Sequence, residues 1–373
     1  MIRIHLFGII LLCNSLAYSQ KEVKSIAFGS CSNQNKDLSI FDTILSRQPD
    51  VFIYLGDNIY ADTDNMRVLR RKYRILKKNP HYKKFEALTP IIATWDDHDY
   101  GLNDSGKHYP KKEASKKIFL NFFKEPKQSV RYSHTGIYTS YTYTSDGKSI
   151  QVILLDLRTF RDNLKPYDGF LAGDSSYRYT LDYSPQMNPD STLLGADQWK
   201  WLEQQLLQPA DVRIIGSSTQ FATQYNGYET WANYPFEQER FLQLIRQTKA
   251  NGIVFISGDL HYAELSYIKP EGLYGIHDLT SSGLTEKWEF SVPNKYRIGP
   301  PIRENQFGMI RFEFNQPEPQ FILEIVDRFG QVRIQQAVRL SDLQFWPSVS
   351  SIFYKPHTCT RHLESIFFFV DQF

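Results

Sequence analysis

The sequence has few cysteines and almost no net charge. Its 373 residues include three cysteines, and 43 Lys and Arg stand against 41 Asp and Glu, for a formal net charge of +2. So small a charge creates no overall field that would attract nucleic acid or a membrane surface, and we expect no specific nucleic-acid partner. The sequence also lacks internal repeats and low-complexity linkers, which excludes a solenoid and favours one large domain.

Long hydrophobic runs are missing too. The apolar stretch 6–13 is too short to span a bilayer, and the basic residue Arg3 precedes it. Small residues follow at Ala17 and Ser19, an order typical of a secretory signal peptide. We therefore expect residues 1–19 to be removed by a cut after Ser19, and the mature chain to be secreted or periplasmic.

Removal of this segment would leave only Cys31 and Cys359, enough for one disulfide or for none. Attachment of a lipid at Cys13 is an alternative, but bulky Leu12 stands where a small residue is required. The position of Cys31 at the end of an apolar run favours a different use for this thiol, as a metal ligand.

Several short apolar runs each end in a cluster of polar residues. The runs are apolar throughout and rich in β-branched residues, which is the pattern of a strand covered on both faces. With the polar residues that end them, they occupy residues 24–31, 50–60, 89–97, 151–158, 213–220 and 252–261. These runs predict the strands of a buried sheet.

Segments with helical periodicity separate the apolar runs. Apolar residues recur at helical spacing in 38–48, 195–208 and 236–252, and Gly252 is a C-cap signal for the last of these. The succession of strands and helices indicates an α/β fold.

Two further regions predict antiparallel strands. Residues 138–156 alternate in polarity around Asp146 and Gly147, which predicts a β-hairpin with a tight turn. Residues 309–338 alternate in the same way. The sheet is therefore expected to be mixed rather than purely parallel.

The stretch ATWDDHDYG places three carboxylates and one imidazole in four consecutive positions after an apolar run. Like charges this close repel one another, and burying one of them unpaired is costly. Ligands of open α/β sheets bind beyond the carboxyl ends of the strands, so the polar ends of the runs should meet. Their mixed donors suit a hard or borderline metal, and more than one of them. The candidate residues are Cys31, Asp57, Tyr60, Asp96, Asp97, His98, Asp99, Asn103, Asp259 and His261.

Five short motifs follow one another along the chain. They are FGSCS at 28–32, GDNIYAD at 56–62, WDDHDYGLND at 95–104, LDLRTFRD at 155–162 and SGDLH at 257–261. Together they resemble the PhoD-like alkaline phosphatase and phosphodiesterase branch of the calcineurin-like metallophosphatases. This resemblance implies a four-layer sandwich of two mixed β-sheets flanked by helices, the metallophosphatase fold.

The resemblance also implies a role for each matching residue. Asp57 would bridge two metal positions, and Cys31, Tyr60 and His261 would hold Fe(III). Asp259 would hold the second metal, Ca(II), with other divalent metals as alternatives.

The stretch DDHD departs from the superfamily pattern, in which Gly-Asn-His is usual. Asp97 falls at the position of a metal-ligand asparagine and His98 at that of the catalytic histidine, so the resemblance implies catalytic work for both. Asn103 could supply the missing amide ligand instead, or contact the substrate. The superfamily's mid-chain histidine ligand has no match, and Gln220 lies nearest to its place in order.

Two basic features could serve substrate binding. Arg158 and Arg161 follow an apolar run and would grip phosphate, or equally anchor acidic loops. Residues 67–84 contain nine Lys or Arg, which is typical of a solvated helix face. Their place just after Asp57 also permits a role in steering anionic substrates inward.

We expect residues 20–345 to form a secreted, metal-dependent phosphoric ester hydrolase, and 346–373 to form a tail without predicted structure. Its substrates would be phosphate monoesters or diesters, membrane phospholipids included, and it would act as a monomer. The sequence leaves open the choice between monoester and diester. The main alternative is a non-catalytic phosphate- or lipid-binding surface protein that kept the fold. A mononuclear iron oxidase built on Cys31, Tyr60 and His261 is disfavoured by the surplus of carboxylates.

Overall fold

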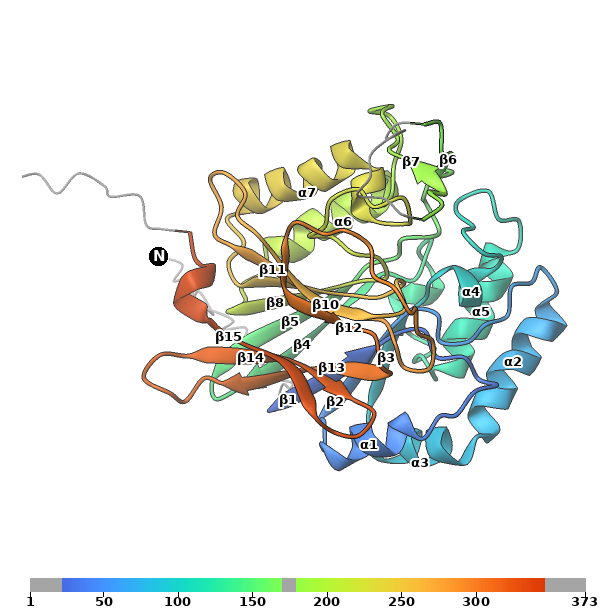
Figure 1. The fold of residues 1–373 in the computed structure, drawn as a ribbon, viewed down its shortest axis with the longest axis horizontal. Coiled ribbons are helices and arrows are strands. Elements are labelled where there is room, and N and C mark those ends of the chain that lie inside the picture. Colours follow the sequence, from blue (N-terminus) through green and yellow to red (C-terminus); the bar gives the residue numbers. More distant parts are fainter. Residues whose placement is uncertain (1–21, 170–178, 346–373) are drawn as a thin grey trace, which may run out of the picture.

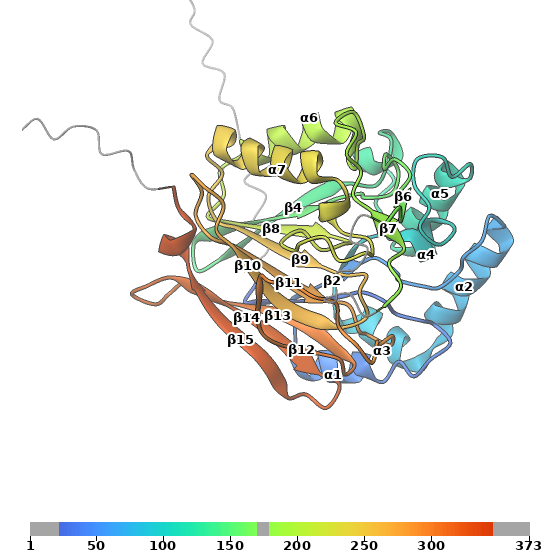
Figure 2. The ribbon, with the colours of Figure 1, turned by 45° about the horizontal axis from the view of Figure 1, so that its top comes forward.

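Two mixed β-sheets pack against each other at the centre of the fold, and helices cover their outer faces (Figures 1 and 2). The structure, a computed structural model, describes residues 22–169 and 179–345. The predicted signal segment, Cys13, Cys359 and the predicted tail 346–373 lie outside the described residues. The predicted four-layer α/β sandwich is confirmed.

The first sheet has six strands: β1 (Ser25–Gly29), β2 (Val51–Leu55), β3 (Ile91–Thr94), β13 (Gln306–Glu313), β14 (Gln320–Asp327) and β15 (Val332–Arg339). Their order in space is β15-β14-β13-β1-β2-β3. β1, β2 and β3 run parallel, whereas β13 pairs antiparallel with β1 and with β14. The strands predicted within 309–338 thus extend the first sheet.

The second sheet has seven strands: β4 (Thr139–Ser145), β5 (Lys148–Leu154), β8 (Val212–Ser217), β9 (Ile253–Ser257), β10 (Ala263–Ile268), β11 (Ile276–Ser281) and β12 (Arg297–Ile302). Their order is β12-β10-β11-β9-β8-β5-β4, with β5, β8, β9 and β11 parallel. The predicted hairpin joins β4 to β5, and both turn residues, Asp146 and Gly147, have positive φ. A separate short pair is formed by β6 (Lys165–Pro166) and β7 (Tyr183–Ser184).

Helices cover the outer face of each sheet. α1 (Ile40–Ser46), α2 (Met66–Lys78), α3 (Pro80–Leu88) and α5 (Lys112–Phe122) pack on the side of the first sheet, and α6 (Gly195–Leu206) and α7 (Pro235–Thr248) pack on the second. The remaining helical turns are α4 (Asp97–Tyr100), η1 (Val130–Tyr132), η2 (Trp231–Asn233) and η3 (Leu340–Leu343). Within the described residues, no helix combines the length and apolar character needed to cross a membrane.

The strand β2 shows why the apolar runs are continuous. Val51, Ile53 and Leu55 point between the two sheets, while Phe52 and Tyr54 point toward the rings of α1 and α3. All five side chains are fully buried, and burial of each stabilises the fold by about 1.5–3 kcal/mol. A strand with both faces covered has no position at which a polar residue is favoured.

The end of α7 differs from the prediction. The helix stops at Thr248, and Lys249 takes the left-handed conformation with φ of 54°, so Gly252 is not its cap. Gly252 serves the turn into β9, where a Cβ would lie 2.2 Å from the carbonyl oxygen of Asp211. The glycine is needed for a close backbone approach rather than for helix termination.

Candidate metal centre

The loops that follow four parallel strands bring the predicted ligands together. Cys31 follows β1, Asp57 and Tyr60 follow β2, α4 follows β3, and the loop after β9 carries Asp259 and His261. Backbone hydrogen bonds tie these loops to one another, including one of 3.4 Å from the Cys31 N–H to the Gly56 carbonyl. The carboxyl ends of strands from both sheets thus meet at one edge of the sandwich.

One group of donors surrounds the thiol of Cys31. Its Sγ lies 3.4 Å from Asp57 Oδ2, and the Tyr60 hydroxyl lies 3.4 Å from the same oxygen and 3.0 Å from His261 Nε2. The ligand atoms of Cys31, Asp57 and His261 lie within 4.8 Å of one another. Ser282 braces this group, because its hydroxyl is 3.1 Å from Cys31 Sγ and accepts the His261 backbone N–H at 2.8 Å.

A second group consists of carboxylates. Asp57, Asp96, Asp97 and Asp259 each offer an oxygen within 4.8 Å of the others, and Asp57 also forms a third such group with Asp97 and His98. Asp57 therefore belongs to all three groups, as a residue shared between two metal positions would.

The backbone of these ligands is strained. Cys31, Asp57, Asp259 and His261 have φ values of 61°, 49°, 77° and 54°, in the left-handed region that non-glycine residues rarely adopt. Each such residue costs on the order of 1–3 kcal/mol, and such strain clusters at functional sites. Before Asp57, Gly56 is required at φ of 107°, since a Cβ there would lie 2.5 Å from the Cβ of Asp96.

The donor set fits bound cations. Oδ1 of Asp57, Oδ1 of Asp97 and Oδ2 of Asp96 are buried without a hydrogen-bond partner among the described residues. Burial raises the pKa of Asp57 and of Asp259 well above the usual carboxyl value. Uncompensated carboxylates at this depth would be protonated, whereas a bound cation would favour their charged form.

The neighbouring donors behave consistently with metal ligation. Burial raises the pKa of the Cys31 thiol to about 12 and lowers that of His261 to about 4, so His261 is a neutral imidazole. A thiol with so high a pKa becomes a thiolate only if a cation pairs with it. The donor types are the thiol, phenol and imidazole of one group and the carboxylates of the other.

His98 stands at the edge of the ligands and contacts Asp62. Its Nδ1 lies 2.6 Å from Asp62 Oδ1, and its ring packs on Tyr60 with centroids 4.2 Å apart. Burial would lower the pKa of His98, but Asp57, Asp62 and Asp97 outweigh it and raise the pKa to about 11. Asp62 contacts only the Nδ1 atom of this imidazole, so Nε2 can contact another group.

The DDHD stretch divides its charges among different partners. Asp97 lies in the ligand groups, and although burial raises its pKa, Arg158 and His98 prevail and lower it to about 2. Asp99 instead accepts hydrogen bonds from Asn58 and from Tyr73, at 2.6 and 3.0 Å, and fixes the turn. Part of the charge of this stretch thus belongs to the candidate metal ligands, and part of it fixes the loop.

The two predicted phosphate-binding arginines lie behind the ligands. Arg158 is fully buried, with contacts to Asp96, Asp97 and Glu229, and Arg161 lies 3.2 Å from Glu229. Neither lines the cavity over the ligands. Of the two roles open in the sequence, this geometry favours the anchoring of acidic loops.

A cavity of about 170 Å³ opens over the ligands. Asn103 is exposed at the mouth of this cavity, and its amide donates to Asp104 at 2.7 Å. This position is compatible with either predicted role, metal ligand or substrate contact. Gln220 does not line the cavity, and its amide donates to Glu264 and Thr280 at 2.7 and 2.8 Å. The cavity is lined by Asp57, Asp97, His98, Asn103, Asp104, Asp182, Tyr183, Tyr228, Glu229, Asp259, His261 and Trp288.

Several of these residues were not predicted from the sequence. Asp62 lies within the GDNIYAD motif, so its position beside His98 had a local signal. Glu229, Tyr228 and Trp288 lie in loops without periodicity, far along the chain from the ligands they approach, and no sequence signal marks them.

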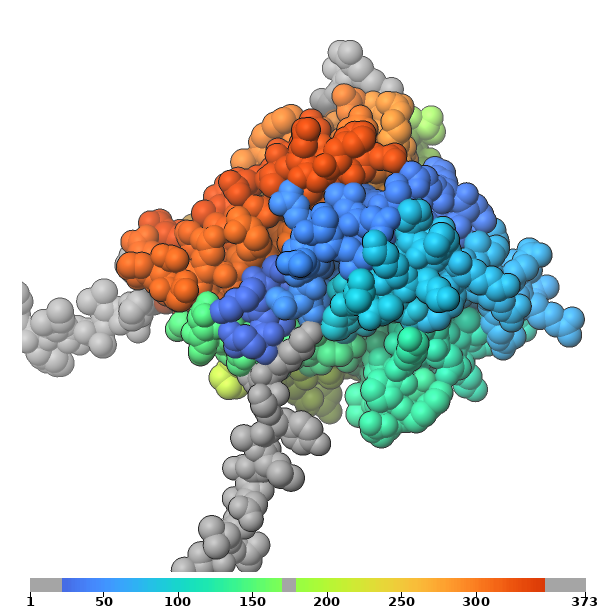
Figure 3. All heavy atoms as spheres, turned by 90° about the horizontal axis from the view of Figure 1, so that it is seen from below, coloured from blue at the N-terminus to red at the C-terminus, as the bar shows by residue number. Residues whose placement is uncertain are grey.

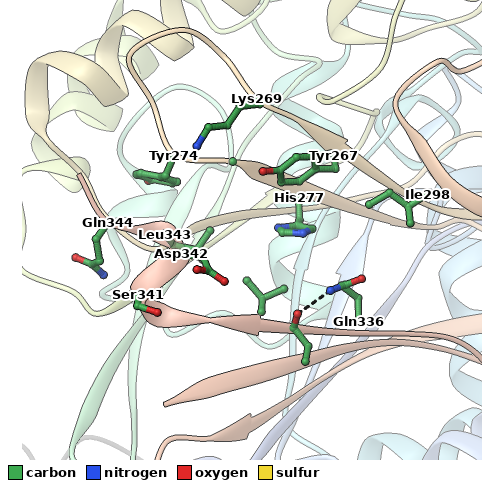
Figure 4. Close-up of a pocket in the computed structure, with 13 residues that line it drawn as sticks. Tyr267, Lys269, Tyr274, His277, Ile298, Gln336, Ser341, Asp342, Leu343 and Gln344 are labelled. Atoms are coloured by element: carbon green, nitrogen blue, oxygen red, sulfur yellow. Dashed lines mark hydrogen bonds between the residues drawn. The ribbon is translucent and has the colours of Figure 1, made fainter. Parts of the chain in front are cut away.

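A second cavity, of about 480 Å³, lies away from these ligands (Figure 4). Tyr267, Tyr274 and His277 from the β10–β11 hairpin line one side, and Ser341 and Asp342 of η3 line another. No candidate metal ligand lines it, so it is separate from the cavity over the ligands.

The sequence is similar to those of known phosphatases. The sequence model of the PhoD-like phosphatase family matches residues 26–340. The chain is 24% identical over 276 residues to alkaline phosphatase D of Bacillus subtilis (strain 168), covering 64% of this chain and 46% of that protein. The chain therefore spans about half the length of this curated relative.

Solved structures share the fold. The structure of PhoD superposes with a TM-score of 0.61 at 17% identity, covering 86% of this chain and 72% of that chain. Purple acid phosphatase PPD1 from yellow lupin seeds superposes with a TM-score of 0.57 at 12% identity, covering 86% and 54%. The resemblance seen in the motifs is confirmed, and the chain belongs to the PhoD-like phosphatase family.

Proposed function

We propose that this protein is a metal-dependent phosphoric ester hydrolase with a dinuclear site, acting as a monomer on phosphate monoesters or diesters. One observation carries the proposal: Asp57 belongs to all three groups of potential metal ligands. A carboxylate shared between two cations explains how so many acidic groups are buried at one sheet edge.

The donor types divide the ligands between two metals. Cys31, Tyr60 and His261, with Asp57, would hold Fe(III), because phenolate and thiolate donors favour the ferric state. Asp259, with Asp57 and either Asp97 or Asn103, would hold Ca(II), which prefers oxygen ligands. When bound, such a pair supplies a water of low pKa and neutralises phosphoryl oxygens.

The chain's own residues support the leaving group and the acidic ligands. His98 lines the cavity, and Asp62 occupies its Nδ1, so Nε2 is the nitrogen that hands a proton to the departing alcohol oxygen. The Asp104 N–H donates to Asp97 Oδ2 at 2.7 Å, and Arg158 lies 3.6 Å from Asp97 Oδ1, so both contacts hold this carboxylate in the ligand groups. Arg158 and Arg161 act through Glu229 and these acids rather than on the substrate.

The direct test is hydrolysis by the purified protein. We expect release of p-nitrophenol from p-nitrophenyl phosphate or from bis-p-nitrophenyl phosphate. The ratio of the two hydrolysis rates will show whether the protein prefers monoesters or diesters. Chelation should abolish turnover, and readdition of iron with calcium should restore it. A metal-replete protein that binds phosphate but hydrolyses neither compound would instead support the non-catalytic alternative.

We also propose secretion, on the strength of the order of charged, apolar and small residues before Gln20. Expression of the full chain, followed by N-terminal sequencing of the exported protein, should give Gln20 as the first residue. A product that stays in the cytoplasm with residues 1–19 intact would contradict this proposal.

A further inference from the structure

The outer wall of the cavity over the ligands is aromatic. Tyr183, Tyr228 and Trp288 line it, and the last two have ring centroids 4.9 Å apart. Trp288 also meets the ring of His261 edge to face, with centroids 5.4 Å apart. Half-buried rings therefore begin directly beside a proposed metal ligand and lead outward.

Neighbouring rings fix this wall in place. Phe290 stacks on Trp288 with centroids 5.0 Å apart and planes 9° apart. Tyr179 stacks on Tyr228 at 5.4 Å and 15°. The wall is therefore preorganised, and a group placed against it meets rings that do not need to be ordered first.

The same cavity has surplus negative charge at its mouth. Six carboxylates line it, and no Lys or Arg among the described residues does. Glu229 is paired with two arginines, and Asp57, Asp97 and Asp259 belong to the metal groups. That leaves Asp104 and Asp182, neither of which has a basic ion-pair partner within the part of the chain that the structure describes.

We infer that the outer part of this cavity binds an ammonium group carried by the substrate, so that the substrate class is a phosphate ester of an amino alcohol such as choline or ethanolamine. This inference rests on the proposed function. Aromatic faces attract cations, and quaternary ammonium groups are recognised by cages of such rings. An anionic or neutral group at this position would leave both carboxylates uncompensated, whereas an ammonium group pairs with them and packs its methyl groups on Tyr228 and Trp288.

The geometry of the ester suits the arrangement. In phosphocholine two carbons separate the ester oxygen from the nitrogen, so the phosphate and the cation occupy adjacent positions. The proposed metal ligand His261 and the first ring of the wall, Trp288, are likewise adjacent. The phosphate would lie over the metal ligands while the ammonium lies between the rings and Asp182.

The test compares phosphocholine with 3,3-dimethylbutyl phosphate, which has the same shape but a carbon in place of the charged nitrogen. Each is used as a competitor of p-nitrophenyl phosphate hydrolysis, and the ratio of the two inhibition constants is measured. We expect phosphocholine to bind about tenfold more tightly, and Asp182→Asn and Tyr228→Leu each to reduce this ratio severalfold. Asp197→Asn, an exposed carboxylate on α6, is the matched control and should leave the ratio unchanged.

A ratio near one in the unaltered protein, or a preference for the neutral compound, would overturn the inference. So would a ratio that survives both substitutions. If the protein hydrolyses no ester, the proposed function fails, and calorimetric titration with the same two compounds still measures the preference for the cation. The two failures are thus distinguishable.

Discussion

At the scale of single residues, His98 is the group whose role in the chemistry is most specific. If Nε2 protonates the leaving oxygen, His98→Ala should slow hydrolysis of ethyl phosphate by about 10²–10⁴-fold and that of p-nitrophenyl phosphate far less. A good leaving group departs without a proton, whereas an alkoxide does not. The measurement is kcat/KM on both esters.

Asp62→Asn provides a graded control for this prediction. It leaves the imidazole in place but weakens the contact at Nδ1, 2.6 Å in the structure, so it should produce a smaller loss with the same dependence on leaving group. Equal losses on both esters in His98→Ala would assign His98 to ordering the site.

The ligands proposed for iron predict a coloured protein. Phenolate and thiolate bound to Fe(III) each give a charge-transfer band, so the purified protein should absorb visible light. Tyr60→Phe and Cys31→Ser should change different bands, and chelation of calcium should leave most of the colour. A spectrum unchanged in both variants would remove these residues from the iron, and a colourless, fully active protein would exclude iron itself.

At the scale of elements, α2, which follows the loop of Asp57 and Tyr60, carries an unbalanced charge. Its thirteen residues include seven Lys or Arg and no acidic residue, and Lys77 alone among its described basic residues forms an ion pair, with Glu86. The helix begins four residues after Asp62, and it lies with α3 in the light blue region of Figure 3. A helix with this charge would raise the local concentration of anionic substrates if it lay at the rim of the site.

Neutralising part of this helix should therefore slow substrate capture. We expect Arg67→Gln combined with Arg70→Gln to lower kcat/KM for p-nitrophenyl phosphate severalfold at low ionic strength, and to match the unaltered protein at high salt, where the field is screened. Lys200→Gln, which removes an exposed positive charge from α6 on the other sheet, is the control and should leave kcat/KM unchanged. A loss that persists at high salt would show that α2 acts through structure instead.

The strand β11 places His277 against the second cavity (Figure 4), and its Nδ1 is buried without a hydrogen-bond partner among the described residues. Burial lowers the pKa of His277 to about 4, below the ordinary value of 6.5. Between these values the unfolded chain binds the proton and the folded chain does not. The contribution to stability is therefore complete above pH 6.5 and is lost as the pH falls toward 4.

This linkage predicts that His277 accounts for about 3 kcal/mol of the stability lost on acidification. In His277→Leu, the difference in free energy of unfolding between pH 7.5 and pH 4.5 should be smaller than in the unaltered protein. His108→Leu, at an exposed histidine, is the control. An identical pH dependence in the His277 variant would show that this imidazole is accessible to protons in the folded state.

At the scale of the whole molecule, the sheets and the ligands could be predicted because their signals are local. The strands are buried on both faces, so their apolar runs are uninterrupted, and Cys31, Asp57 and Asp259 directly follow such runs. The turn Asp146-Gly147 was similarly evident from its residue types. The end of α7 was not, because Gly252 is explained by its approach to a neighbouring strand rather than by the helix before it.

The surroundings of the ligands could not be predicted, because they depend on contacts between distant loops. Arg158 pairs with Glu229, which is 71 residues away in the chain. Because of this pairing, the Arg158 guanidinium binds acidic side chains and does not face the cavity. Trp288 and Tyr228 resemble core aromatics in the sequence. Only the folded arrangement places them on a cavity wall.

In the proposed dinuclear site, Asp57 joins the loops that follow the strands of both sheets. Elemental analysis of the purified protein tests it most directly. We predict about two metal ions per chain, and fewer than one in Asp57→Asn. Asp64→Asn, in the same loop, is the matched control and should keep both ions. An Asp57→Asn protein that retained both metals and its hydrolytic activity would contradict the dinuclear site.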